Sequence, residues 1–188
     1  MRKIFSLAAG LLLLALAPAR ADEIESAYTK IDLKKCPLID KNDDEGPWAL
    51  WRCDGYEGRP VFVMEGDLRF FIWFDERETN ERIRDQTLAP FNNLGKGVLE
   101  WRLRRGPQGV AEPFATIIRY YTAREGKPEG QVLVVSQIKP GATCHIAYVD
   151  ALANRDANVL AREAADEYAG TFDCGNEPMV IGKSGISR

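Results

Sequence analysis

The sequence predicts an α+β fold: a single domain in which an antiparallel, meander-rich sheet of about six or seven strands carries one C-terminal helix on one face. Two observations lead to this fold class. Apolar and aromatic runs of strand length alternate with connections that contain Gly and Pro, and one alanine-striped segment near the C-terminus has helical spacing. The 188-residue composition, 45% hydrophobic and 28% charged, is that of a globular protein.

The first half of the chain contains three predicted strands, the first of them at residues 48–53. Residues 60–64 and 68–74 flank Glu65-Gly66-Asp67, a three-residue loop whose glycine can adopt a positive φ, and therefore predict a hairpin. Both faces of 68–74 are apolar. We expect this strand either to be central in a covered sheet or to present an aromatic surface.

The second half predicts an antiparallel meander. Residues 98–104 alternate, with Leu99, Trp101 and Leu103 facing inward and Glu100, Arg102 and Arg104 facing outward. Three more β-branched and aromatic runs follow at 114–122, 131–138 and 144–150, joined by short connections.

A helix is expected where small apolar residues recur at helical spacing, with Asn154 or Asp156 as its N-cap and Gly170 at its end. The stripe consists of Ala157, Leu160, Ala161, Ala164, Ala165 and Tyr168. Because most of these side chains are small, the helix should lie close to the sheet. Alternation in the last long strand predicts Cys144, Ile146 and Tyr148 beneath the helix, and His145, Ala147 and Val149 on the opposite face.

The first 21 residues have the pattern of an export signal. Arg2 and Lys3 precede a 13-residue apolar run, and Pro18-Ala19-Arg20-Ala21 supplies the small residues of a cleavage site. The run is too short to span a bilayer, which needs about 20 residues. We therefore expect a Sec-type signal peptide at 1–21, a domain at 22–174 and a mobile tail at 175–188. The expected location is the bacterial periplasm, with secretion as the alternative and no stable membrane insertion.

All four cysteines follow the leader, and an even number in an oxidising compartment predicts two disulfides. We favour Cys36–Cys53 and Cys144–Cys174, since each bond closes a local excursion of the chain. The loop-entropy relation gives about 3 and about 3.6 kcal/mol for these two closures.

The charge balance argues against nucleic-acid binding. The chain has 25 Lys and Arg and 28 Asp and Glu, and three of the basic residues lie in the leader, so the mature chain has a net charge of −6. Non-specific binding to nucleic acid requires a basic surface. An acidic chain is compatible with a cationic protein partner, or simply with solubility.

No metal or cofactor is expected. Asp40, Asn42 and Asp44 have the spacing of a calcium loop, but Glu45 and Trp51 stand where that loop needs Gly and a bidentate Glu. One histidine and no C-x-x-C give a poor zinc site.

Ser136 and His145 are the weak catalytic candidates. If residues 139–142 form a tight turn, the two side chains lie directly opposite each other on neighbouring strands, where a hydroxyl and an imidazole can hydrogen-bond. A third member is missing, and the strand lacks the strained G-x-S-x-G turn that exposes a nucleophile. A polar pair in the sheet is the more common arrangement.

A second candidate is a binding surface of arginines and aromatics, suited to carboxylate, phosphate or sugar ligands. Its members are Arg69, Phe71, Trp73, Arg102, Arg104, Arg119 and Tyr121. The surface requires that the faces of three strands coincide. The alternative is that the aromatics are core and the arginines are paired with carboxylates.

The favoured function is an exported binding or inhibitory protein without catalytic activity, whose partner is a cationic protein or a small anionic or sugar ligand. One alternative is a small periplasmic hydrolase that uses Ser136 and His145, or a carboxylate pair such as Glu100 with Asp67. Another is a structural factor of the cell envelope. The sequence does not define the oligomeric state.

Overall fold

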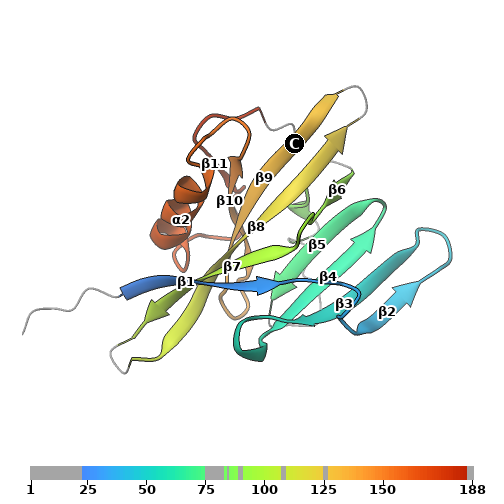
Figure 1. The fold of residues 1–188 in the computed structure, drawn as a ribbon, viewed down its shortest axis with the longest axis horizontal. Helices are drawn as coiled ribbons and strands as arrows, with labels where there is room; N and C mark the ends of the chain where they lie inside the picture. Colours follow the sequence, from blue (N-terminus) through green and yellow to red (C-terminus); the bar gives the residue numbers. More distant parts are fainter. Residues whose placement is uncertain are drawn as a thin grey trace, which may run out of the picture.

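The computed structural model describes residues 23–74, 83, 85–88, 91–106, 109–124 and 127–185, so the predicted signal peptide lies outside the described residues. Two β-sheets pack against each other, and one helix covers the far side of the larger sheet (Figure 1). Sheet A has seven strands in the order β1-β7-β8-β9-β10-β11, with β6 paired to β8. Its strands are β1 (Glu23–Lys30), β6 (Asn92–Asn93), β7 (Val98–Arg105), β8 (Ala111–Arg124), β9 (Lys127–Gln137), β10 (Cys144–Asp150) and β11 (Met179–Ile181).

Sheet B has four strands in the order β2-β3-β4-β5. They are β2 (Leu38–Asn42), β3 (Trp48–Asp54), β4 (Pro60–Gly66) and β5 (Arg69–Phe74), with a short 3₁₀ turn, η1 (Tyr56–Gly58), between β3 and β4. We expected one sheet and find two, so the α+β class is right and the sheet count is wrong. The period-2 pattern of a strand shows which side chains share a face but not which sheet the strand joins.

The main core lies between the sheets. It joins Val61, Val63, Ile72 and Phe74 of sheet B to Leu99, Trp101, Ile118 and Tyr120 of sheet A. The ring of Phe74 meets that of Trp101 edge-on, with centroids 5.6 Å apart. This packing explains one apolar face of β5. The other face belongs to a smaller cluster in which Trp73 and Phe62 pack with Leu50 and Ile83, so β5 is covered on both sides.

The predicted hairpin is the β4–β5 pair, but its turn is one residue shorter than expected. Gly66 pairs with Arg69 inside the ladder, and the loop is Asp67-Leu68. Both loop residues have positive φ, 51° and 58°. Two residues at positive φ define a type I′ turn, whose twist matches that of the flanking strands.

Helix α2 (Ala157–Tyr168) has its alanines against sheet A, as predicted: Ala157, Ala161, Ala164 and Ala165 are buried against Ile117, Leu133 and Val135. Gly170 follows it with a φ of 91°. Neither predicted N-cap side chain caps the helix. Asp156 makes no side-chain cap bond, and Asn154 instead binds the backbone oxygens of Asp150 and Lys183.

The faces of β10 differ from the prediction because a bulge lies between His145 and Ala147. Cys144, Ile146, Ala147 and Val149 all belong to the helix-side cluster, whereas Tyr148 belongs to the core between the sheets. One extra residue in a strand exchanges the faces of all that follow it. The predicted sides of Tyr148, Ala147 and Val149 were therefore wrong.

Residues 175–185, the described part of the expected mobile tail, are attached to the domain. Strand β11 pairs in parallel with β10, and the amides of Lys183 and Gly185 donate to the side chains of Asn154 and Asp150. Both disulfides have the predicted pairing: Cys36 is bonded to Cys53, and Cys144 to Cys174.

Candidate functional site: a lysine-rimmed pocket between the sheets

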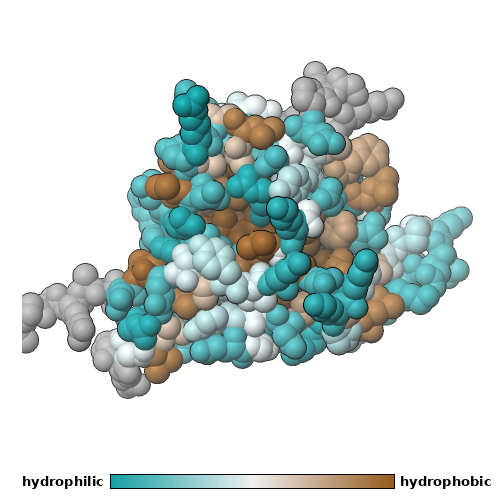
Figure 2. Space-filling model, in the orientation of Figure 1, coloured by the Kyte–Doolittle hydropathy of each residue, from teal (hydrophilic) through white to brown (hydrophobic). Residues whose placement is uncertain are grey.

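A pocket of about 660 Å³ opens where the two sheets meet. Three segments that are distant in sequence line it: residues 30–34 at the end of β1, Phe70 of β5, and residues 93–98 between β6 and β7. Figure 2 shows this side of the molecule, with apolar surface in a hollow bordered by hydrophilic side chains. The volume lies within the range of small-molecule sites.

One wall is the 94–97 loop, held in place by two backbone hydrogen bonds. The Ile31 amide donates to the Gly97 oxygen at 2.7 Å, and the Gly97 amide donates to the Leu94 oxygen at 2.8 Å. Gly97 has a φ of 62°, and a Cβ there would lie 2.2 Å from the Ile31 oxygen. Glycine is therefore required at this close approach, which fixes Leu94 and Lys96 relative to β1.

The opposite wall is the segment that leads from β1 to β2. The Lys35 amide donates to the Asp32 oxygen at 2.8 Å and closes a turn, and the Cys36–Cys53 bond ties the segment to β3. The disulfide thus connects this wall covalently to sheet B, while the glycine loop belongs to sheet A.

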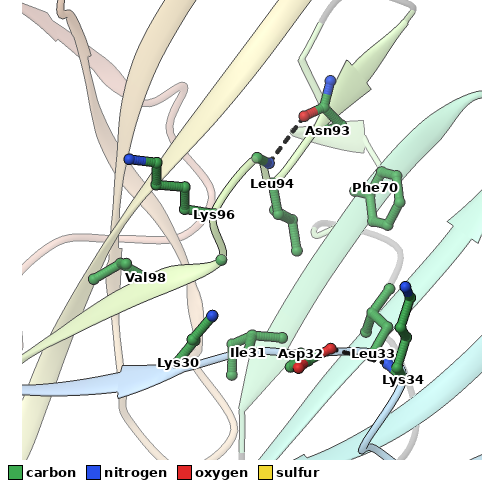
Figure 3. Close-up of a pocket in the computed structure, with 12 residues that line it drawn as sticks. Lys30, Ile31, Asp32, Leu33, Lys34, Phe70, Asn93, Leu94, Lys96 and Val98 are labelled. Carbon is green, nitrogen blue, oxygen red and sulfur yellow. Dashed lines mark hydrogen bonds between the residues drawn. The ribbon is translucent and has the colours of Figure 1, made fainter.

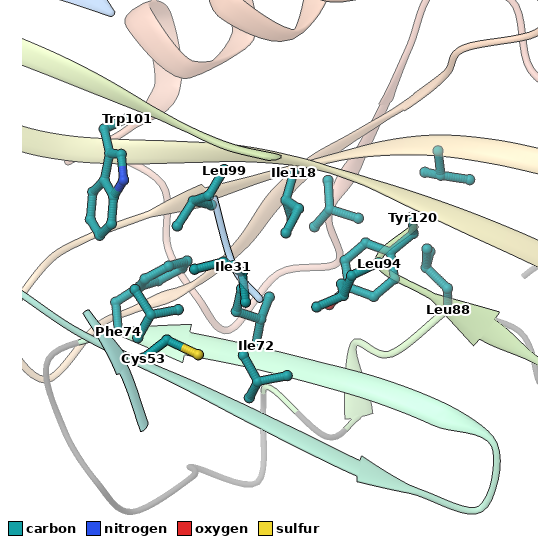
Figure 4. Packing of buried hydrophobic residues seen from close by; sticks show 14 of the residues in the cluster. Ile31, Cys53, Ile72, Phe74, Leu88, Leu94, Leu99, Trp101, Ile118 and Tyr120 are labelled. Atoms are coloured by element: carbon teal, nitrogen blue, oxygen red, sulfur yellow. The ribbon is translucent and has the colours of Figure 1, made fainter. Parts of the chain in front are cut away.

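The floor of the pocket is the margin of the main core. Ile31 and Leu94 are buried members of that core, and Phe70 and Leu33 pack against it. Figure 4 shows Ile31 and Leu94 among side chains from both sheets. A ligand seated here would extend the core with its own apolar surface.

The rim is cationic. Lys30, Lys34 and Lys96 are exposed lining residues, and among the described residues none of their ammonium groups has an ion-pair or hydrogen-bond partner. Lys30 and Lys34 extend from the β1 side, and Lys96 is on the opposite loop with its ammonium directed away from Leu94 and Phe70 (Figure 3). Asp32 also lines the pocket, but it accepts a bond from the Lys34 amide and lies 3.8 Å from the Lys35 ammonium. Three unpaired cations around an apolar floor suit an anion with an apolar part.

Ser136 and His145 lie opposite each other in the β9–β10 register, as predicted, but both are buried, with 1% and 3% of their surfaces exposed. His145 Nδ1 lies 3.2 Å from the Gln86 carbonyl oxygen and 3.1 Å from the Tyr148 hydroxyl oxygen. His145 Nε2 and Ser136 Oγ have no hydrogen-bond partner among the described residues, so the two side chains are not bonded to each other. Burial lowers the pKa of His145 to about 4.

The Arg/aromatic residues are not brought together into one surface. Arg69, Phe71 and Trp73 share β5 of sheet B, where Trp73 is buried. The others belong to strands of sheet A: Arg102, Arg104, Arg119 and Tyr121.

Each sheet A arginine of this set has a structural contact. Arg102 is 7% exposed and forms a two-pronged ion pair with Asp166 of α2, at 2.8 and 2.6 Å. Arg119 donates to Gln131 and Asn158. Arg104 lies over the Phe114 ring.

Tyr121 lies beside the pocket, since its ring packs directly against Gly95. No carboxylate pair forms from Glu100 and Asp67, because Glu100 is buried in sheet A with Arg162 at 2.6 Å and Asp67 is in the β4–β5 turn of sheet B. Among the described residues, no three His, Cys, Asp or Glu side chains are grouped as metal ligands.

Sequence reasoning missed the lysine-rimmed pocket because its three segments meet only in the folded chain. A signal was present: Lys30, Lys34 and Lys35 lie close together in the sequence of an acidic protein, and Lys96 stands between two glycines. A local excess of one charge against the net charge marks a surface that can bind the opposite charge.

Comparisons with protein-family profiles, with characterised proteins and with solved structures found no match to this chain. Within the described residues, no helix has the length and apolar character needed to cross a bilayer.

Proposed function

We propose that this is an exported binding protein of the bacterial periplasm, with residues 1–21 as its cleaved signal peptide and secretion from the cell as the alternative destination. The leader pattern supports export. Two disulfides with no free cysteine fit a protein that folds in an oxidising compartment.

The proposed function is the binding of a small organic anion in the lysine-rimmed pocket. The observation that carries the proposal is the set of three ammonium groups, without ion-pair partners among the described residues, around an apolar floor. Like charges on one rim repel each other, and an anion at the mouth offsets that repulsion while its apolar part covers Leu94 and Phe70.

The hydrolase alternative gains no support from the geometry. A substrate would have to open the sheet to reach Ser136, and the His145 ring is buried with Nδ1 against Gln86 and Tyr148. The envelope-factor alternative has no feature that favours it over binding.

Fluorescence titration with 8-anilinonaphthalene-1-sulfonate, an aromatic sulfonate, tests the proposal on the mature protein. We expect saturable binding at one site. The triple variant K30E/K34E/K96E should bind at least about tenfold more weakly, since each exposed charge contributes up to about 1 kcal/mol and its reversal adds repulsion.

The matched control is K41E/K139E/K183E, which has the same net charge but alters lysines outside the pocket lining. It should bind the probe as the wild-type protein does. Equal weakening in both triple variants would mean that net charge, and not this pocket, governs binding, and the proposed function would be wrong.

A further inference from the structure

We infer that the ligand is a monomeric single-chain amphiphile: one acidic headgroup held at the lysine rim and one alkyl chain lying on the floor of the pocket. This inference rests on the proposed function and specifies its ligand. It follows from how the polar and apolar groups are separated within the lysine-rimmed pocket.

The charged and apolar groups occupy different levels of the pocket. The three lysines are exposed at the opening, whereas Ile31 and Leu94 are buried below them as part of the main core. Figure 3 shows the Leu94 side chain directed toward Ile31, away from the rim. A ligand that contacts both the lysines and the apolar floor has its charge at one end and its apolar part at the other.

The floor is suited to an alkyl chain more than to a sugar. Three of its residues are aliphatic, Ile31, Leu33 and Leu94, and Phe70 adds one ring. The lining offers few groups for hydroxyls: the Asn93 side-chain oxygen already accepts from the Gly95 amide, and Asp32 is engaged by Lys34 and Lys35. A sugar would leave its hydroxyls unpaired over this surface, which is unfavourable.

The arrangement favours one headgroup at the rim. Asp32 lies on the same wall as Lys34, so a ligand with a second acidic group along its length would meet this carboxylate. The site is a concave pocket between two sheets, and not a flat cationic face that would rest on a bilayer. We therefore expect the pocket to bind a free amphiphile and not a membrane surface.

Calorimetric titration with hexanoate, octanoate and decanoate, each below its micelle concentration, tests the inference. Each added methylene buried on the floor should lower Kd about fourfold, until the chain exceeds the pocket. Decan-1-ol, with the same chain and no charge, should bind at least about tenfold more weakly than decanoate. Anionic phospholipid vesicles should not co-sediment with the protein.

Two kinds of variant distinguish the contribution of the ligand's alkyl chain from that of its headgroup. Leu33 is a half-buried wall residue. The L33N variant should therefore raise the Kd of decanoate about fivefold and that of hexanoate less than twofold. The matched control is L152N, at an exposed leucine outside the pocket lining, and it should change neither Kd. The K30E/K34E/K96E variant should raise the Kd of all three carboxylates by the same factor.

The outcomes distinguish the two proposals. Equal Kd values for hexanoate and decanoate, with dependence on the lysines, would overturn the amphiphile and leave anion binding intact. Loss of all carboxylate and sulfonate binding, or binding that ignores the lysines, would overturn both. Co-sedimentation with vesicles at a Kd below that of decanoate would replace the free amphiphile by a membrane surface.

Discussion

Each face of sheet B borders a hollow, and the two hollows differ in whether their charged side chains have ion-pair partners. On the inner side is the lysine-rimmed pocket, and on the outer side is a groove of about 900 Å³ whose apolar lining includes Trp48, Met64 and Phe71. Strand β5 contributes to both, because successive side chains point to opposite faces: Phe70 lines the pocket and Phe71 lines the groove.

The groove is the larger hollow, yet two of its three acidic lining residues have cationic neighbours. Asp43 is paired with Lys41, and Asp67 lies 3.9 Å from Arg69. The lysines of the pocket have no such partners among the described residues. We therefore propose the pocket and not the groove as the binding site, because its cations are unpaired among the described residues, although the groove has the larger volume.

The largest expected effect, a loss of stability together with a loss of binding, comes from removing the disulfide that anchors one wall of the pocket. The double variant C36A/C53A should lose about 3 kcal/mol of unfolding free energy, since the bond closes 17 residues of chain. It should also lose binding of the sulfonate probe, because residues 31–36 are no longer tied to sheet B. Urea unfolding and the probe titration measure the two effects.

The matched control is C144A/C174A, which removes the bond beside α2. Its stability should fall by a comparable amount, about 3.6 kcal/mol for 30 residues, while probe binding persists. If both variants keep the probe site, the disulfide is not what positions the wall.

The second effect is acid destabilisation through His145, which does not line the pocket. Its folded-state pKa of about 4 lies below the 6.5 of an unfolded chain, so the unfolded state takes up a proton first as the pH falls. Stability is therefore full above pH 6.5 and falls progressively as the pH drops toward 4, by on the order of 3 kcal/mol.

Urea unfolding at several pH values measures this loss. The variant H145Q keeps a polar side chain without a titrating ring. Any loss of its unfolding free energy between pH 6.5 and 4 that comes from position 145 should be less than about 1 kcal/mol. An H145Q protein with the wild-type slope between pH 6.5 and 4 would assign the acid sensitivity to other groups.

A third prediction attempts to make the groove resemble the pocket. The variant D43N/D67N releases Lys41 and Arg69 from their carboxylates without adding a charged residue. A second site for the sulfonate probe should then appear, roughly tenfold weaker than the pocket, because two cations are available in place of three. A stoichiometry that stays at one would mean that unpaired charge is insufficient to create a site.

The smallest expected effect is that of salt on the wild-type pocket. The three lysines are exposed, so raising the salt concentration from about 0.1 M to about 1 M shortens the screening length from about 10 to about 3 Å. The Kd of the probe should rise severalfold and that of a neutral alcohol should not. Identical responses would indicate apolar binding without an electrostatic part.

The sequence predicted local features well. The β4–β5 hairpin, the alanine face of α2 and the pairing of Cys36 with Cys53 all depend on patterns within a few tens of residues. The register that places Ser136 opposite His145 followed from one turn.

The failures have two physical causes. A strand such as β5, apolar on both faces, could lie inside one large sheet or inside a second, smaller one. Its pattern therefore did not reveal sheet B. The bulge after His145 inserts one residue and reverses the faces of Tyr148 and Val149, which no period-2 pattern predicts. The pocket needs both the division into two sheets and the meeting of three distant segments, so it could not be derived before the fold.

The most direct test of the central claim is an amide proton–nitrogen correlation titration of the labelled mature protein with 8-anilinonaphthalene-1-sulfonate. Saturable shifts should concentrate at residues 30–34, Phe70 and 94–98, and leave Trp48 and Met64 of the groove unchanged. Shifts centred on the groove, or none in the lysine-rimmed pocket at saturating probe, would contradict the account.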